Sequence, residues 1–445
     1  MTYLQAGING RRFTVPNWLF LLWSTTAAFG TYFCIYGFRK PFTAAGYEGA
    51  ELWGIEYKAV LVASQVFGYT LSKFVGIRVI AEMSPQRRTR RILLLVAVAQ
   101  LALLAFGLTP PPYNLAWLFI NGLPLGMAFG MVLRVLEGRV LTEMLTAGLC
   151  ASFILADGFT KSVGGWLLKA GVSEGWMPFA AGALFLPPLA GFVAMLACVP
   201  PPDTRDVDAR SVRTPMTAND RRRFFMRYAV GLSAVIALYL TVTILRSVRA
   251  DFAREIWSGL GYVGSPSVFT LSEIVVSLGV VILTGAGVLI RDNRAAFFTA
   301  VLISIAGLLL IPLAVVGRSY GLDGFGFMVL IGLGLYLPYV AVHTTIFERL
   351  IAMTGDRGNI GFLMYLTDSI GYLGYVGVML CHGMLAMTGV TVAKSGDFLA
   401  FFEPLCWVIS GAGIASAAVC WVYFARRQAT VEKQIALVVP AGETA

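Results

Sequence analysis

The sequence predicts an all-α membrane protein whose twelve transmembrane helices form two pseudo-symmetric six-helix bundles. Three observations predict this class: an apolar composition, long apolar runs, and landmarks that recur at one spacing. Of the 445 residues, 58% are hydrophobic and 13% are charged, which is about half the charge of a soluble protein. The mean hydropathy is +0.76. Soluble globular, disordered, collagenous and disulfide-stapled classes are therefore excluded.

Twelve apolar stretches have the length of about 20 residues that spans a bilayer. Charged residues or Pro and Gly separate them from one another. The predicted segments are 17–40, 59–82, 92–109, 114–136, 146–170, 177–199, 228–249, 266–290, 295–316, 325–347, 360–383 and 400–425.

Basic residues outside these segments gather on one side of the membrane if the helices alternate strictly. Most of them lie in 84–91, 201–227, 291–294 and 426–433. The positive-inside rule makes that side cytoplasmic, so both termini are expected inside the cell, with 41–57 and 386–399 on the opposite face. We expect an integral protein of the bacterial inner (plasma) membrane. The net charge of +10 then reflects topology, and no nucleic-acid partner is expected.

The longest polar stretch divides the chain into two halves of similar length. The predicted organisation is an N-terminal six-helix bundle at 1–200, a basic cytoplasmic linker at 201–227, a C-terminal bundle at 228–428 and a cytoplasmic tail at 429–445.

Three landmarks of the first half recur 207 positions later. Arg39 corresponds to Arg246, the basic run 84–91 to 291–294, and Lys161 to Asp368. Two six-helix halves joined by a basic linker form the major-facilitator architecture, which places its substrate site between the halves near the middle of the membrane.

Charged residues within spanning segments are costly and mark functional sites. The central cations are Arg39, Lys40, Lys73, Lys161 and Arg246, with Arg249 one turn further on; the acids are Asp157, Glu273 and Asp368. The five central cations exceed the three acids by two charges, so we expect a cavity with a net charge of about +2 that favours an anion.

The expected partners of these charges differ. Asp157 precedes Lys161 by four residues on the same helical face, so an internal ion pair and a substrate role are both open for that lysine. Arg39, Arg246 and Lys73 have no carboxylate three or four residues away. Their counterions must come from another helix or from a ligand. Arg39 and Arg246 are candidates to bind one anion from both sides, because a guanidinium group binds phosphate or carboxylate through two hydrogen bonds; interhelical pairing is the alternative.

Four short motifs carry a resemblance to a known family. They are YGFRKPFTAA (36–45), GYTLSKFVG (68–76), TKSVGG (160–165) and TDSIGYLGY (367–375). Together they resemble the organophosphate:phosphate antiporter branch of the major facilitator superfamily. The resemblance implies that Arg39 and Arg246 bind phosphate, that Lys73 is the basic residue of the second helix, and that Lys161 stands where the family often has a histidine. Pro41 and Glu82 depart from the pattern, as expected for a divergent bacterial offshoot.

The leading functional hypothesis is a secondary transporter, expected as a monomer, for a phosphorylated or other anionic organic solute, possibly exchanged for phosphate. The alternatives are a proton-coupled symporter that uses Asp157, Glu273 or Asp368, and a non-transporting anion sensor. There is no phosphate-binding P-loop, and His343 and His382 are far apart. We therefore expect no enzyme, catalytic residue, metal or cofactor.

Overall fold

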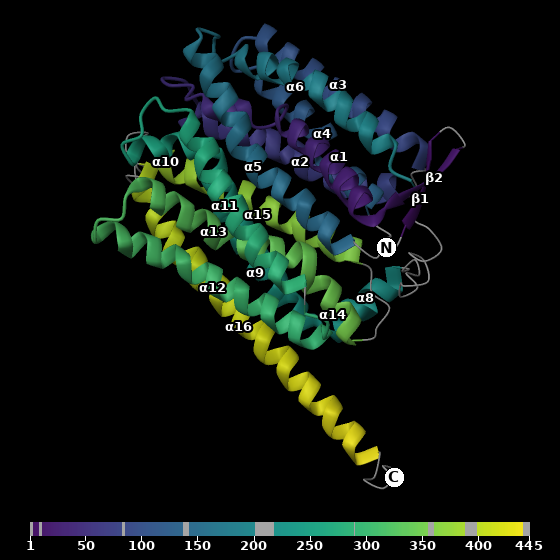
Figure 1. Cartoon of the computed structure of the whole chain (residues 1–445). Helices are drawn as coiled ribbons and strands as arrows, with labels where there is room; N and C mark the ends of the chain where they lie inside the picture. The colour runs from purple at the N-terminus through teal and green to yellow at the C-terminus, as the bar shows by residue number, and fades with distance from the viewer. Residues whose placement is uncertain are drawn as a thin grey trace.

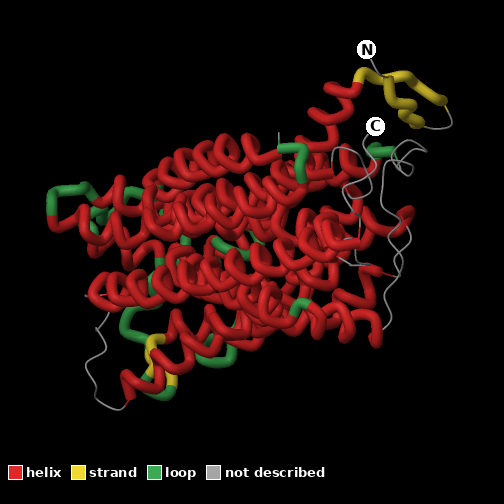
Figure 2. Tube along the Cα trace, turned by 90° about the horizontal axis from the view of Figure 1, so that it is seen from below, coloured by secondary structure: helices red, strands yellow, loops and turns green. Residues whose placement is uncertain are grey.

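A computed structural model describes residues 3–8, 11–81, 85–136, 142–200, 218–288, 290–354, 360–387 and 398–438. These residues are nearly all helical, and the long helices run roughly side by side (Figure 2). Each of the twelve predicted segments contains a helix.

The first group of helices lies together on one side of the molecule in Figure 1. It comprises α1 (Asn17–Tyr36), α2 (Tyr57–Ala81), α3 (Pro85–Leu108), α4 (Leu115–Leu136), α5 (Thr142–Lys169) and α6 (Met177–Ala197).

The second group follows the short helix α8 (Ala218–Arg227). It comprises α9 (Ala229–Asp251), α10 (Ala253–Gly259), α11 (Ser267–Val288), α12 (Asn293–Ser319), α13 (Gly324–Ala341), α14 (Phe347–Thr354), α15 (Ile360–Met387) and α16 (Phe398–Val438). A single π turn, η2 (Val342–Ile346), joins α13 to α14, and a 3-10 turn, η1 (Pro41–Ala44), follows α1.

Two short antiparallel ribbons are the exceptions to the predicted all-helical structure. Strands β1 (Tyr3–Ile8) and β2 (Arg11–Pro16) precede α1, and β3 (Glu51–Leu52) and β4 (Ile55–Glu56) precede α2.

The helices have the surface of a membrane protein. Within the described residues, ten helical stretches are long and apolar enough to cross a membrane. Large apolar side chains face outward along them: Leu101 and Ile282 are 63% and 69% exposed. Such surface is unfavourable in water and favourable in lipid. The remaining two predicted segments correspond to α5 and α15, each 28 residues long. The all-helical membrane fold is therefore confirmed.

Three predicted boundaries were wrong. Helix α1 ends at Tyr36, so Arg39 and Lys40 lie in the turn before η1, because Pro41 starts a new helical turn. The helix of the predicted segment 92–109 starts earlier, because residues 85–91 belong to α3. Pro is accepted in the first turn of a helix, and Arg and Gln favour helix. Helix α16 continues to Val438, beyond the end of the predicted segment 400–425, because no Gly or Pro interrupts 426–438.

The predicted linker lies partly outside the described residues. Residues 201–217 are not described, and 218–227 form α8. The predicted outer segment 386–399 is described only at its ends, and 439–445 are also outside the described part.

The two groups of helices touch along two seams, where α2 packs on α15 and α5 packs on α11. The second seam is close because Gly158 has no side chain. A Cβ atom at Gly158 would lie 2.2 Å from the carbonyl oxygen of Phe269 on α11. Glycine here lets the two backbones touch, as at many membrane helix contacts.

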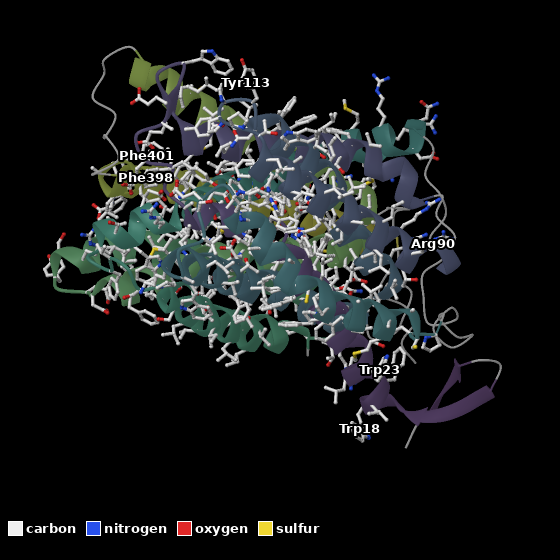
Figure 3. All side chains as sticks on the ribbon, turned by 90° about the horizontal axis from the view of Figure 1, so that it is seen from above. Trp18, Trp23, Arg90, Tyr113, Phe398 and Phe401 are labelled. Atoms are coloured by element: carbon white, nitrogen blue, oxygen red, sulfur yellow. The ribbon has the colours of Figure 1, made fainter. Side chains whose placement is uncertain are left out.

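The two ends of the bundle differ. Trp18 and Trp23 lie beside the N-terminal ribbon, Arg90 lies toward the same end, and Phe398 and Phe401 lie at the other end (Figure 3). The indole of Trp23 donates to the carbonyl oxygen of Met195 at 3.1 Å. Amphipathic rings at a helix end are typical of a membrane–water interface.

Candidate functional site

Arg39 is positioned by side chains of α2 and α4 rather than by the helix that precedes it. The amide of Gln65 donates to the carbonyl oxygen of Arg39, and the amide of Asn121 donates to that of Phe38, each at 3.1 Å. Gln65 also donates to the side-chain oxygen of Asn121 at 2.8 Å. These bonds satisfy two carbonyl groups of the turn that follows α1 and fix this turn, which carries Arg39.

Arg246 lies in the last third of helix α9 and meets Arg39 around the ring of Tyr372 on α15. The guanidinium carbon of Arg39 lies 3.9 Å from the ring centre of Tyr69 and 5.8 Å from that of Tyr372. Arg246 donates to the hydroxyl oxygen of Tyr372 at 3.0 Å and lies 4.4 Å from the ring centre of Tyr339. Aromatic faces stabilise desolvated cations, so tyrosines from both groups of helices surround the two arginines.

Neither arginine has a carboxylate partner among the described residues. Each side chain is buried, with 5% of its surface exposed. The Nε atom of each is buried without a hydrogen-bond partner. A buried donor without a partner is costly, so both guanidinium groups have hydrogen-bonding capacity left for a ligand.

The other buried cations of the described residues are paired with acids. Five ion pairs involve Lys40 with Asp251, Lys161 with Asp157, Lys73 with Asp368, Arg249 with Glu273, and Lys58 with Glu255. Arg39 and Arg246 are therefore the two buried cations of the described residues that have no acid partner.

The structure brings the predicted acids into two clusters. In the first cluster, between α5 and the turn after α1, Lys161 Nζ lies 2.5 Å from Asp157 and Lys40 Nζ lies 3.7 Å from it. Arg249 donates to Glu273 at 2.7 Å at the seam between α5 and α11. Of the two roles left open for Lys161, the ion pair with Asp157 is the one that the structure contains, and Lys40, expected to bind substrate, also has acids beside it.

The second cluster surrounds Asp368 on α15. It accepts hydrogen bonds from Lys73 on α2 and from the hydroxyl of Tyr239 on α9. The Nε2 atom of His343, on the π turn η2, lies 3.6 Å from Asp368 and 3.4 Å from the Tyr239 hydroxyl. Lys73, expected to bind substrate, is thus engaged by an acid of another helix.

Ion pairs also join the two groups of helices at the end far from the N-terminal ribbon. Lys58 lies 2.6 Å from Glu255, and Arg254 lies 2.9 Å from Glu48. Partial burial and the neighbouring carboxylate of Glu255 raise the pKa of Glu56, just before α2. The two ion pairs therefore link the two groups of helices at this end.

Sequence reasoning missed four side chains that contact the charged sites: Tyr69, Tyr372, Asp251 and His343. Two of them carried a signal in the sequence. Tyr69 precedes Lys73 by four residues and Tyr372 follows Asp368 by four, which places each on the same helical face as the charge. Asp251 and His343 carried no such signal, because their partners lie on other elements.

Solved structures with a similar fold are membrane transporters. The chain matches the D-xylose–proton symporter with a TM-score of 0.59 and 14% identity, over 91% of this chain and 97% of that one. It matches the nucleoside transporter NupG with a TM-score of 0.56 and 13% identity, over 91% and 100%. The predicted major-facilitator fold is confirmed.

No curated protein matches the sequence. A family model described as a family of unknown function, DUF5690, matches residues 41–427. This range includes Arg246 but begins two residues after Arg39. The chain belongs to the DUF5690 family.

Proposed function

We propose that the protein is a secondary transporter that moves a phosphorylated or other anionic organic solute across the membrane by alternating access. The two solved structures of similar fold are named for transport of D-xylose with a proton and of nucleosides. Neither name refers to an anionic solute. The proposed substrate class therefore rests on the charges of this chain.

The observation that carries the proposal is the pair of buried guanidinium groups without carboxylate partners, Arg39 and Arg246. Two like charges that have lost their hydration repel each other in a low dielectric. An anion between them would relieve this repulsion and use their free Nε donors. Because every other buried cation of the described residues already has an acid, these two are the ones left for a ligand.

The chemistry of the surrounding residues favours an organic anion. A guanidinium group matches phosphate or carboxylate oxygens with two parallel hydrogen bonds. The rings of Tyr69, Tyr339 and Tyr372 lie against the arginines and offer apolar faces to the rest of a solute. The motifs around Arg39 and Lys73, which resemble the organophosphate:phosphate antiporters, favour phosphate among the anions.

The position of the two arginines supports alternating access. Arg39 belongs to the first group of helices, Arg246 to the second, and an anion held by both would link the two groups. Rocking of one group against the other would break the Lys58–Glu255 pair at one end and expose the anion there. Exchange for phosphate is one coupling mode. Proton symport is the second, and the cluster around Asp368 favours it.

Uptake into proteoliposomes tests the proposal. Vesicles preloaded with phosphate should accumulate labelled phosphate and labelled glycerol phosphate by counterflow, without ATP. Arg39→Gln and Arg246→Gln should abolish uptake. Arg318→Lys, in a pair with Glu403 on α16, should retain it, because that pair lies on the outer helices of the second group.

Two results would contradict the proposal. One is binding of these anions without counterflow in the correctly inserted protein, as expected for a sensor. The other is undiminished uptake in both Arg→Gln variants.

A further inference from the structure

The short basic helix α8 lies at the end of the bundle where the N-terminal ribbon also lies (Figure 1). Four of its ten residues are arginine, and it leads directly into the candidate membrane span Ala229–Asp251. The proposed anion site uses no residue of α8. Arginine clusters next to a membrane span are typical of segments that bind the anionic headgroups of phospholipids.

Contacts with α9 and α16 fix the position of α8. Phe224 is buried, and its ring centre lies 5.3 Å from that of Tyr228, which stands between α8 and α9. The carbonyl oxygen of Arg227 accepts hydrogen bonds from the hydroxyl of Tyr423 at 3.3 Å and from Arg427 at 3.1 Å. The Arg427 guanidinium also lies 4.6 Å from the ring centre of Tyr228. These bonds satisfy a carbonyl group at the end of α8 and hold this end against α16.

A line of exposed apolar side chains crosses from α9 onto α8. Val230, in the first turn of α9, is 56% exposed, and Met226, four residues earlier, is 66% exposed. The amide of Tyr228 donates to the carbonyl oxygen of Phe224 at 3.3 Å, which continues the helical pattern across the break between the two helices. Residues four positions apart share a helix face. Met226 therefore extends the lipid-facing surface of the span by one turn.

Two arginines follow on the far side of Met226 from the span. The side chains of Arg222 and Arg223 are both exposed, and Arg222 precedes Met226 by four residues. Four residues of helix rise by about 6 Å, and the headgroup layer on each side of a bilayer is about 5–8 Å thick. Guanidinium groups at this height therefore meet lipid phosphates while Met226 meets acyl chains.

We propose that α8 binds one anionic phospholipid, with its headgroup phosphate on Arg222 and Arg223 and an acyl chain along Met226 and Val230. A guanidinium group binds phosphate oxygens through two hydrogen bonds, and an anionic headgroup keeps the net charge that attracts it. The apolar side chains directly beside the arginines favour a lipid over a free phosphate. The site does not involve Arg39, so it stands whether or not the protein transports an anion.

Thermal unfolding of the full-length protein in a neutral detergent tests the site. Rising mole fractions of phosphatidylglycerol should raise the melting temperature by several degrees in a saturable way, and phosphatidylcholine should raise it less. Each arginine near an anionic headgroup contributes about fivefold in affinity, so the α8 double variant (Arg222→Gln with Arg223→Gln) should increase the half-saturating mole fraction roughly 30-fold.

A matched pair of substitutions controls for general surface charge. Arg90 lies toward the same end of the bundle (Figure 3), on α3. The α3 double variant (Arg90→Gln with Arg91→Gln) removes the same charge and should leave the half-saturating mole fraction within about twofold of wild type, because exposed charges more than about 10 Å from the headgroup are screened. Met226→Gln should increase it at least about threefold, because the acyl chain loses apolar contact.

A second measurement needs no variant. Raising NaCl from about 0.05 M to about 0.5 M should weaken binding of phosphatidylglycerol to wild type at least about fivefold, because salt screens the contact between arginine and phosphate. Binding that is insensitive to salt contradicts a site built on the two arginines, and this result stands even if the α8 double variant does not fold.

Three other results would overturn the proposal. Equal weakening by the α8 and α3 double variants would show that surface charge in general, and not α8, attracts the lipid. Glycerophosphoglycerol, the same headgroup without acyl chains, should shift wild type and the α8 double variant equally; stabilisation of wild type alone, as strong as that by phosphatidylglycerol, would mean that α8 binds a free phosphate ester. Absence of saturable stabilisation of wild type by phosphatidylglycerol refutes the site outright.

Discussion

Asp157 lies between two lysines, Lys161 and Lys40. Replacing Asp157 and Lys161 singly and together tests how much these buried charges contribute to the free energy of unfolding. Lys161 is 2.5 Å from Asp157 and Lys40 is 3.7 Å from it, and all three side chains are buried. Because Coulomb attraction falls as 1/r, Lys40 exerts about two thirds of the attraction that Lys161 exerts on this carboxylate. The two single substitutions are therefore not equivalent.

The structure predicts an order of stability. Asp157→Asn leaves Lys161 buried without its ion-pair partner, because the other acid that acts on Lys161, Glu273, is paired with Arg249. Such a loss costs about 3–5 kcal/mol in the free energy of unfolding. Lys161→Met leaves Asp157 with Lys40, so the cost should be smaller, about 1–2 kcal/mol. The double variant removes both charges and should lie within about 1 kcal/mol of wild type.

Denaturant titration in mixed micelles, with wild type and the three variants under the same conditions, measures these differences. The coupling energy of the cycle should be large and stabilising. A double variant whose loss equals the sum of the two single losses would show that the pair makes no energetic contribution. Equal losses for the two single variants would show that Lys40 does not support Asp157.

Two further predictions concern topology and the seam between the groups. A membrane-impermeant maleimide should label Glu51→Cys but not Arg90→Cys in intact cells expressing an otherwise cysteine-free protein, because the basic run 84–91 is expected to be cytoplasmic; labelling of position 90 from outside would reverse the orientation. Gly158→Ala should lower the melting temperature and slow transport, because its Cβ would lie 2.2 Å from a carbonyl oxygen of α11. Gly191→Ala on α6, where nothing lies within 4 Å, should change the free energy of unfolding by less than about 0.5 kcal/mol, and equal effects at both sites would contradict the close approach.

The helices were predictable because lipid imposes one simple requirement on a spanning segment. A run of about 20 apolar residues is by itself enough to predict a membrane-spanning helix. The landmarks offset by 207 residues indicated two related halves. The first and last residues of the helices were less predictable, because they also depend on local backbone geometry and not only on apolar composition. Composition alone extended the first segment to residue 40, whereas the turn before Pro41 ends α1 at Tyr36.

The partners of the charges were predictable only within one helix. The spacing of Asp157 and Lys161 places both on one face, and the two side chains meet. Lys73 and Asp368 are 295 positions apart, and only the packing of α2 on α15 brings them together. The same packing decides that Tyr372 lies between Arg39 and Arg246, which no local pattern encodes.

The most direct test of the central claim, that Arg39 and Arg246 jointly bind the anion, is the affinity of Arg39→Lys and Arg246→Lys for phosphate. Both variants keep the charge and lose the two-pronged geometry. Each lost charge-assisted hydrogen bond contributes about 1.5–3 kcal/mol, so affinity should fall roughly 10- to 150-fold. The melting temperature without ligand should stay near that of wild type, and Arg318→Lys should keep full affinity. If both lysine variants fold and bind phosphate or an organophosphate as tightly as wild type, the two arginines do not form the anion site.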